Sequence, residues 1–234
     1  MCGIVGGVAD GDVLPHILEG LRRLEYRGYD SAGVALVSAA GSIVRRRSVG
    51  RVAELSALIA RDALAGSIGI GHTRWATHGG VVEHNAHPLL SGEDIAVVHN
   101  GIIENFAELR QELQAQGYVF GSETDTEVIA HLIHRERSRR PDLLSACRAA
   151  MEQLRGAFAI AVLSRSDPDR LCVARMGCPL LLGLAESGQY FASDVAALLP
   201  VTRRVVYLED GDLAEVTRSG IRIEDARGQV VARQ

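Results

Sequence analysis

The sequence predicts an α+β fold in which two sheets pack on one another and carry helices on their outer faces. Short apolar strands occur in the first 100 residues and again after residue 156, and helical patterns are grouped between them. Apolar residues make up 47% of the 234 residues, which is enough for a large core, and aromatic residues only 4%, so that core is aliphatic. Two sheets that are each apolar on one face need a layered arrangement to bury those faces.

The first half of the chain alternates strands with helices. An apolar run at 3–9 predicts a buried strand, and apolar residues spaced three and four apart at 12–26 predict an amphipathic helix. The next expected segments are strands at 33–38 and 42–47 joined as a hairpin, a helix at 51–62, a strand at 67–73, a polar loop at 74–93, a strand at 94–100 and a helix at 102–116.

Two further helices precede a series of short strands. Thr124 and Glu127 have the spacing of a capping box, which predicts a helix from there to about Arg139. Pro141 suits the first turn of a helix that ends near Gly156. The later strands are expected at 157–164, 170–176, 179–184, 189–193, 204–209, 212–217 and 221–226, with a short helical piece at 194–199. No Pro-, Gly- or Ser-rich linker divides the chain, so residues 1–234 are expected to form one domain.

Composition excludes several classes of protein. The formal net charge of −4 gives no reason to expect nucleic acid or an anionic membrane as a partner. No run of 18 apolar residues predicts a membrane span, and no signal-peptide pattern is present, so we expect a cytoplasmic location. All 25 basic residues are arginines, which excludes a Gly-Lys-Ser/Thr phosphate loop and Schiff-base chemistry. The four cysteines include no Cys-x-x-Cys pair and indicate reduced thiols.

Cys2 stands directly behind the initiator methionine, where processing commonly exposes such a residue as the new terminus. That terminus would carry a thiol and an α-amine, with unperturbed pKa values of about 8.5 and about 7.7–8.0. The amine can then take the thiol proton near neutral pH, and the thiolate is a nucleophile that needs no histidine. On position alone, Cys2 fits better as a small residue that begins an ordinary strand, and the other motifs are needed to favour a catalytic role.

Arg74, Thr77 and His78 lie within five residues of one another after the strand at 67–73, with the indole of Trp75 between them. An arginine can bind a carboxylate through two hydrogen bonds, and a threonine hydroxyl can add a third. A polar loop with one arginine is also ordinary protein surface.

Asn100 and Gly101 lie at the end of the strand at 94–100. A side-chain amide and a backbone N–H that point the same way form an oxyanion hole, although Asn-Gly is also a common turn pair. Asp125, in the first turn of a predicted helix, could bind a substrate ammonium group, but a carboxylate is favoured at any helix start.

Together these groups are what hydrolysis of the side-chain amide of a free amino acid requires, and glutamine is the obvious substrate. Five histidines crowd the same region, at 72, 78, 84, 87 and 99. None belongs to a His-Glu-x-x-His motif, so we expect neither a metal nor another cofactor.

Eight motifs resemble the glutaminase domain of glutamine-dependent amidotransferases with an N-terminal cysteine nucleophile: MCGIVG, LRRLEYRGYDSAG, GHTRWATHG, NAHP, VVHNGIIEN, SETDTEVIAHL, LRGAFA and ALLPVTR. The likeness covers essentially the whole chain. The motif forms EYRGYDSAG and HTRWATHG resemble those of the amidotransferases of amino-sugar biosynthesis. Amidophosphoribosyltransferases carry Gln-His-Arg-Gly-Gln-Asp at the first of these motifs, and asparagine synthetases carry Arg-Gly-Pro-Asp.

The resemblance implies the four-layer αββα sandwich of the N-terminal nucleophile hydrolases. It also implies that Cys2 attacks the glutamine side-chain carbonyl with its own α-amine as base, and that a loop carrying Trp75 closes over the substrate. The implied site residues are Cys2, Asn100 and Gly101 for catalysis; Arg74, Trp75, Thr77, His78, Gly101 and Asp125 for binding glutamine; and Arg27 and His87 in support.

The resemblance further implies a second half, which binds and isomerises fructose 6-phosphate and accepts the ammonia, in a full-length homo-oligomer. Nothing in this sequence corresponds to that sugar-phosphate isomerase half, and its lysine chemistry has no lysine here. We therefore expect this chain to make glutamate and ammonia but no amino sugar. Two alternatives stay open: an N-terminal cysteine hydrolase of other acylated amides, and a non-catalytic domain that binds glutamine without turnover.

Overall fold

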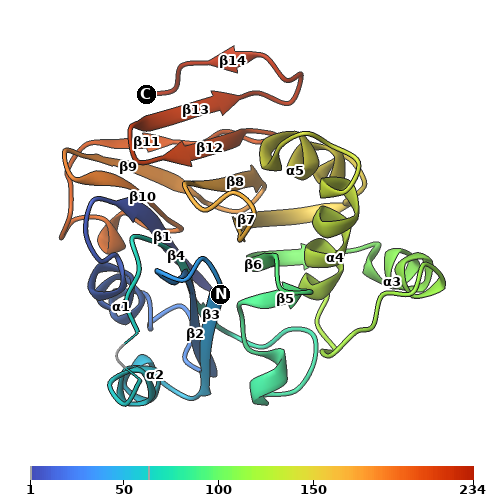
Figure 1. Cartoon of the computed structure of the whole chain (residues 1–234), viewed down its shortest axis with the longest axis horizontal. Coiled ribbons are helices and arrows are strands. Elements are labelled where there is room, and N and C mark those ends of the chain that lie inside the picture. The colour runs from blue at the N-terminus through green and yellow to red at the C-terminus, as the bar shows by residue number, and fades with distance from the viewer. Residues whose placement is uncertain (1, 63) are drawn as a thin grey trace.

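The computed structural model describes residues 2–62 and 64–234, so the predicted removal of Met1 concerns a residue outside those described. Within them, two seven-stranded antiparallel sheets pack face to face, and helices cover both outer faces (Figure 1). This confirms the four-layer α+β sandwich that the sequence predicts.

The first sheet has the N-terminal strand in its middle. Its strand order is β11 (Val205–Tyr207), β9 (Leu181–Ala185), β10 (Gly188–Ala192), β1 (Gly3–Ala9), β4 (Ile68–Arg74), β2 (Ser31–Val37) and β3 (Ile43–Val49). On its outer face lie α1 (Leu14–Arg23) and α2 (Val52–Ile59), whose apolar side chains are buried against the strands. Both neighbours of β1 therefore come from distant parts of the sequence.

The second sheet is built from the later strands. Its order is β14 (Val230–Val231), β13 (Gly220–Glu224), β12 (Leu213–Thr217), β8 (Arg170–Met176), β7 (Gly156–Ser164), β6 (Ile95–Ile103) and β5 (Leu89–Ser91). Its outer face carries α3 (Phe106–Ala115), α4 (Thr126–Arg137) and α5 (Leu143–Met151). Short 3₁₀ turns occur at Glu83–Asn85 and Val195–Ala197.

The space between the sheets is filled with aliphatic side chains. Ile4 and Ile70 of the first sheet belong to one fully buried cluster with Val98 and Ala161 of the second. Burying such side chains removes apolar area from water, at about 25 cal/mol for each Å². This cluster fixes how the two sheets sit on each other, and with that the distance between β1 and β6.

The strand after the polar loop is longer than predicted. β6 continues to Ile103 and α3 begins only at Phe106, whereas a helix was expected from residue 102. The additional residues stay extended because they pair with the start of β7, with Ile103 opposite Gly156. Asn100 and Gly101 therefore lie inside a strand and not at a strand-to-helix turn.

Other predicted boundaries also need correction. The expected loop at 74–93 contains the short strand β5, which pairs with β6, and strand β14 was not expected at all. The capping box does not form, because the Glu127 carboxylate accepts hydrogen bonds from the backbone N–H groups of Gly121 and Ser122. These contacts draw the loop before α4 across the start of the helix.

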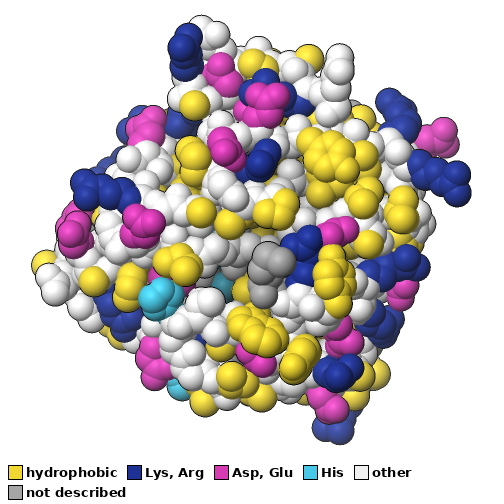
Figure 2. Space-filling model, turned by 180° about the vertical axis from the view of Figure 1, so that it is seen from behind, with side chains coloured by type: hydrophobic (Ala, Val, Ile, Leu, Met, Phe, Trp, Pro, Cys, Tyr) yellow, Lys and Arg dark blue, Asp and Glu magenta, His cyan; other side chains and the backbone are white. Residues whose placement is uncertain are grey.

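The surface carries charges of both signs. Figure 2 shows arginine, aspartate and glutamate side chains interspersed over one face, in keeping with the net charge of −4. None of the helices in the described part of the chain is long and apolar enough to cross a membrane.

Candidate active site

The candidate site forms where three strands end close together. Cys2 precedes β1, Arg74 ends β4, and Gly101 lies near the end of β6 in the other sheet. Because Gly3 is opposite Thr73 in the β1–β4 pairing, Cys2 is held beside the segment that follows Thr73. Cys2 is thus positioned by the backbone pairing of its neighbour Gly3, which constrains it more than a loop would.

These strand ends enclose a small hollow of about 10 Å³. Eight of the predicted site residues line it: Cys2, Arg74, Trp75, Thr77, His78, His87, Gly101 and Asp125. The unpredicted His99, Thr124 and Thr126 complete the lining. A space of this size holds about one water molecule. An amino-acid substrate can therefore enter only after part of the wall has moved.

The Cys2 thiol is enclosed by backbone groups of Trp75. Its Sγ accepts a hydrogen bond from the Trp75 N–H at 3.3 Å and lies 3.5 Å from the Trp75 carbonyl oxygen, to which it can donate. Burial raises the pKa of the thiol, and the hydrogen bond from Trp75 and the charge of Arg74 only partly oppose this effect. The thiol is therefore protonated near neutral pH and needs a base before it can attack.

Backbone N–H groups of β6 point into the site beyond the end of β5. In a strand, alternate N–H groups face the same edge. The His99 N–H donates to Nδ1 of His87 at 3.4 Å, and the Ile103 N–H donates to Asp125 Oδ2 at 2.9 Å. The N–H of Gly101 lies between these two and faces the same side, toward the hollow that Gly101 lines.

Only glycine fits at position 101. Its φ is +121°, and a Cβ there would lie 2.0 Å from the Ala157 carbonyl oxygen. The preceding Asn100 places its Nδ2 group 3.2 Å from the Cys2 carbonyl oxygen, and its Oδ1 accepts from Nε2 of His72 at 3.0 Å. A side-chain amide and a backbone N–H thus lie together beside Cys2.

Arg74 binds the loop that follows it. Its guanidinium group donates to the carbonyl oxygens of His78, Gly79 and Gly80, with the Gly80 contact at 3.1 Å. These bonds fold residues 75–80, here called the lid loop, back over the end of β4. The lid loop carries three of the predicted binding residues, namely Trp75, Thr77 and His78.

Two neighbouring side chains fasten the lid loop, and sequence analysis assigned neither a role. Asn85 donates from Nδ2 to Gly80 O and to Glu123 Oε2, and its Oδ1 accepts from the Glu123 N–H at 3.0 Å. Asp30 accepts from the Ala76 N–H at 2.9 Å. The sequence gives one indication of their importance: Asn85 lies in NAHP and Asp30 in LRRLEYRGYDSAG, two of the motifs that carry the family resemblance.

The remaining predicted residues differ in their burial and in their contacts. Asp125 is buried, with one oxygen held by Ile103, while Thr77 is exposed at the rim. The ring of His78 lies against that of Phe106, with 5.0 Å between centroids. The structure therefore places a carboxylate, Asp125, and an arginine, Arg74, in the wall of the same hollow.

Arg27 does not line the hollow. Its guanidinium pairs with Asp194 at 2.6 Å and donates to the Tyr26 hydroxyl, and the next residue, Gly28, packs against the backbone of Arg74. Arg27 thus braces the loop beside the site.

His87 does line the hollow, and burial holds its pKa well below the ordinary value. It is therefore a neutral group in the wall. Among the described residues, no group of three or more His, Cys, Asp or Glu side chains is arranged as a metal site.

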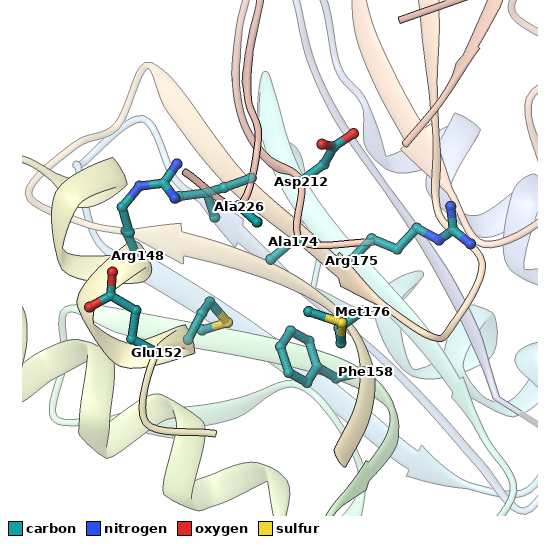
Figure 3. Close-up of a pocket in the computed structure, with 11 residues that line it drawn as sticks. Arg148, Glu152, Phe158, Ala174, Arg175, Met176, Asp212 and Ala226 are labelled. Atoms are coloured by element: carbon teal, nitrogen blue, oxygen red, sulfur yellow. The ribbon is translucent and has the colours of Figure 1, made fainter. Parts of the chain in front are cut away.

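A second hollow, of about 140 Å³, lies beside α5 at the ends of β7, β8 and β12 (Figure 3). Its lining includes Phe158 and Met176, and two of its charged groups form ion pairs, Arg148 with Glu224 and Asp212 with Arg233, both at 2.7 Å. None of its described lining residues is a predicted site residue. The chemistry suggested by the sequence therefore gathers around Cys2.

Comparison with known proteins shows the family of the chain. The model of a family described as a glutamine amidotransferase domain matches residues 72–200, and the chain belongs to that family. Two relatives are named glutamine–fructose-6-phosphate aminotransferase (isomerizing). The one from Acidithiobacillus ferridurans is 67% identical over 228 residues, which is 97% of this chain and 37% of the relative. The one from Pseudomonas putida is 54% identical over 234 residues, which is 100% of this chain and 38% of the relative. The chain thus spans less than two-fifths of their length.

Solved structures show the same fold. The glutamine phosphoribosylpyrophosphate amidotransferase from B. subtilis matches with a TM-score of 0.84 at 26% identity, over 98% of this chain and 50% of that one. A glutamine aminotransferase class-II domain protein from Silicibacter pomeroyi matches with a TM-score of 0.67 at 18% identity, over 96% and 99% of the two chains. At that identity the second likeness shows the fold alone.

Proposed function

We propose that this chain hydrolyses L-glutamine to L-glutamate and ammonia through a γ-glutamyl thioester on Cys2. The observation that carries the proposal is that Cys2, Arg74, Gly101 and Asp125 line one hollow. These four residues come from four separate segments and supply a nucleophile, a cation, an oxyanion donor and a carboxylate. The nucleophile and the oxyanion donor match the reacting side-chain amide, and the cation and the carboxylate match the α-carboxylate and the α-ammonium group of a free amino acid.

The reaction divides into two steps. Once Met1 is removed, the α-amine of Cys2 takes the thiol proton and Sγ attacks the amide carbon. The Gly101 N–H and a Nδ2–H of Asn100 stabilise the oxyanion, and the amine returns the proton to the departing ammonia. Water then attacks the thioester, which releases glutamate and restores the thiol. Removing one oxyanion donor typically costs about 10²–10³ in rate.

Substrate recognition rests on the two charged walls. Arg74 and Thr77, with the backbone of His78, would bind the α-carboxylate, and Asp125, with the Gly101 carbonyl, would bind the α-ammonium group. This charged lining favours a free amino acid over the acylated amides of other N-terminal cysteine hydrolases, which would need an apolar acyl pocket. Trp75 would cover the bound substrate and exclude water.

If this chain is part of a protein as long as its relatives, the ammonia released from glutamine would be used in a second reaction. We propose that a sugar-phosphate isomerase half uses it to convert fructose 6-phosphate to glucosamine 6-phosphate, in a cytoplasmic homo-oligomer. The name of the relatives and the additional length of their chains support the isomerase half.

The test is the intact mass of the purified chain before and after reaction with a diazo-ketone analogue of glutamine. We expect loss of one methionine and a single adduct that L-glutamine suppresses, together with glutamate release in an assay. Cys2→Ala should abolish the adduct, and Cys178→Ala, which changes another partly exposed thiol, should leave it. A processed terminus that stays unlabelled would overturn the proposal, and labelling without glutamate release would favour a glutamine sensor.

A further inference from the structure

We propose that His72 is a positioning residue, which orients the Asn100 amide so that its N–H groups serve the oxyanion. The inference rests on the proposed glutaminase function. His72 lies on β4 in the first sheet and is fully buried, while Asn100 lies on β6 in the second. Their contact bridges the two sheets beside Cys2.

The geometry fixes which ring nitrogen of His72 carries the proton. Nε2 lies 3.0 Å from the His99 carbonyl oxygen and 3.0 Å from a side-chain atom of Asn100. A carbonyl oxygen can only accept a hydrogen bond, so Nε2 must be the protonated nitrogen. The Asn100 atom that faces it must then be the acceptor Oδ1 and not the NH₂ group.

The other side of the amide gives the same assignment independently. Asn100 Nδ2 lies 3.2 Å from the Cys2 carbonyl oxygen. Turning the amide over would place two oxygens against each other there and two N–H donors against each other at His72. The carbonyl groups of His99 and Cys2 therefore define one orientation for the pair. In that orientation the second Nδ2–H of Asn100 remains for the oxyanion.

The ring is also kept neutral. Burial lowers the pKa of His72 to about 3, although its hydrogen bond to Asn100 acts in the opposite direction. Among the described residues Nδ1 has no hydrogen-bond partner, and the ring of His87 lies against it with 4.2 Å between centroids. A neutral ring protonated only on Nε2 donates to Asn100 at every pH at which the enzyme would work.

Two substitutions distinguish the effect of losing the hydrogen-bond donor from the effect of losing the volume of the ring. His72→Leu fills the site without a donor, whereas the amide nitrogen of His72→Gln can reach the place of Nε2 and donate. We expect His72→Leu to lower kcat for glutamine hydrolysis about 10–100-fold with KM within about twofold, and His72→Gln to recover most of kcat. In an Asn100→Ala background, His72→Leu should cause no further loss. His134→Gln, on α4, is the matched control.

Two measurements distinguish a positioning role from a purely structural one. Alkylation of Cys2 by iodoacetamide needs no oxyanion hole, so its rate should be the same in wild type and His72→Leu. ¹⁵N NMR of the wild-type chain should show His72 neutral with its proton on Nε2.

Unchanged kcat in His72→Leu while Asn100→Ala is impaired would overturn the inference. Additive losses in the double variant, or a proton on Nδ1, would do the same. A wild-type chain that hydrolyses no glutamine would instead contradict the proposed function, and the NMR measurement would still decide the state of His72.

Discussion

In the proposed function, Asp125 combines a structural and a recognition role in one carboxylate. Its Oδ2 accepts the Ile103 N–H at 2.9 Å, which ties the start of α4 to the end of β6. Its other oxygen is available for the substrate ammonium group in the hollow that Asp125 lines. Because the group is buried, a charge pair formed there is shielded from water and is stronger than one on the surface.

Asp125→Asn keeps the shape and can still accept from Ile103, but it removes the charge. We expect KM for glutamine to rise about 10²-fold or more, since breaking a buried charge pair costs about 2–5 kcal/mol. Hydrolysis of a glutamine analogue without its α-amine should be unaffected. Steady-state kinetics with both substrates make the comparison, with Glu108→Gln on the exposed face of α3 as the control. Equal losses on both substrates would mean that the substitution disturbs the site and not recognition.

The absence of lysine makes the proposed general base chemically unique. After removal of Met1, the α-amine of Cys2 would be the only primary amine in the chain. We expect one equivalent of an amine-selective acetylating reagent to abolish glutamine hydrolysis, because an acetylated amine cannot accept the thiol proton. Mass spectrometry would count the acetyl groups, and thiol titration would verify that the cysteines are unchanged. Full activity in singly acetylated chains would exclude the amine as the base.

Sequence could predict the reactive side chains better than their supports. Residue type and local pattern made Cys2, Arg74 and Asp125 candidates, the family resemblance assigned them roles, and the structure places all three around one hollow. His72 and Asn85 were not candidates, because their roles depend on partners 28 and 38 residues away, Asn100 and Glu123. Such pairs become visible only when the strands are placed side by side.

Among the structural segments, the lid loop decides whether the site is open. Its backbone is held by hydrogen bonds to the side chains of Arg74, Asp30 and Asn85. The hollow beneath it has room for about one water molecule. In the proposed function, glutamine would displace the loop on entry, so these contacts would oppose its entry and stabilise the closed state afterwards.

Asn85→Ala should shift the lid loop toward its open state. The change removes hydrogen bonds worth about 1 kcal/mol each, so we expect KM for glutamine to change several-fold and the loop to close less completely. Trp75, the only tryptophan, reports closure through its fluorescence, which can be titrated with glutamine in a Cys2→Ala chain. Gln116→Ala, on the far end of α3, is the control. An identical titration in the Asn85 variant would show that this contact does not govern the loop.

The end of β6 marks where prediction of elements failed. An apolar, helix-like pattern after Gly101 predicted a helix from residue 102, yet the strand runs to Ile103. Pairing with Gly156 of β7 outweighs local helical preference there. The same extension places Asn100 and Gly101, the proposed oxyanion residues, inside β6, so the wrong boundary lies at a proposed site.

Considered as one body, the molecule has the layers that its sequence predicts but an order of strands that it could not reveal. Grouping of strands and helices along the chain was enough for the αββα sandwich. Placing β9 to β11 beside β1 required knowledge of pairs such as Val5 with Ala192. Periodicity describes which face of a strand is buried, and it carries no information on which distant strand lies next to it.

Stability should fall steeply in mild acid. Burial lowers the pKa of His72, His87 and His99 in the folded chain, whereas unfolded histidine titrates near pH 6.5. The unfolded state thus binds more protons below about pH 6.5, and stability present above that pH is lost as the pH falls. Each histidine contributes up to about 1.4 kcal/mol per pH unit. Below about pH 4.5, Glu127 adds to this loss, because hydrogen bonds lower its pKa despite burial.

Denaturant unfolding from neutral pH to pH 5 measures this dependence. His72→Gln, which cannot titrate, should flatten the curve by about one proton, and His134→Gln is again the control. The same slope in wild type and His72→Gln would mean that the ring is already charged in the folded state.

Because β1 lies in the middle of its sheet, that sheet can be completed only late in synthesis. Its neighbour β10 lies more than 180 residues further along the chain, so the first strand stays incomplete until most of the protein has left the ribosome. At about 5–20 residues per second, that delay is roughly ten to forty seconds. An aminopeptidase that trims the residue before Cys2 has this interval in which the end of the nascent chain is accessible. A chain that keeps the residue before Cys2 has no free α-amine on Cys2 and would remain inactive in the proposed mechanism.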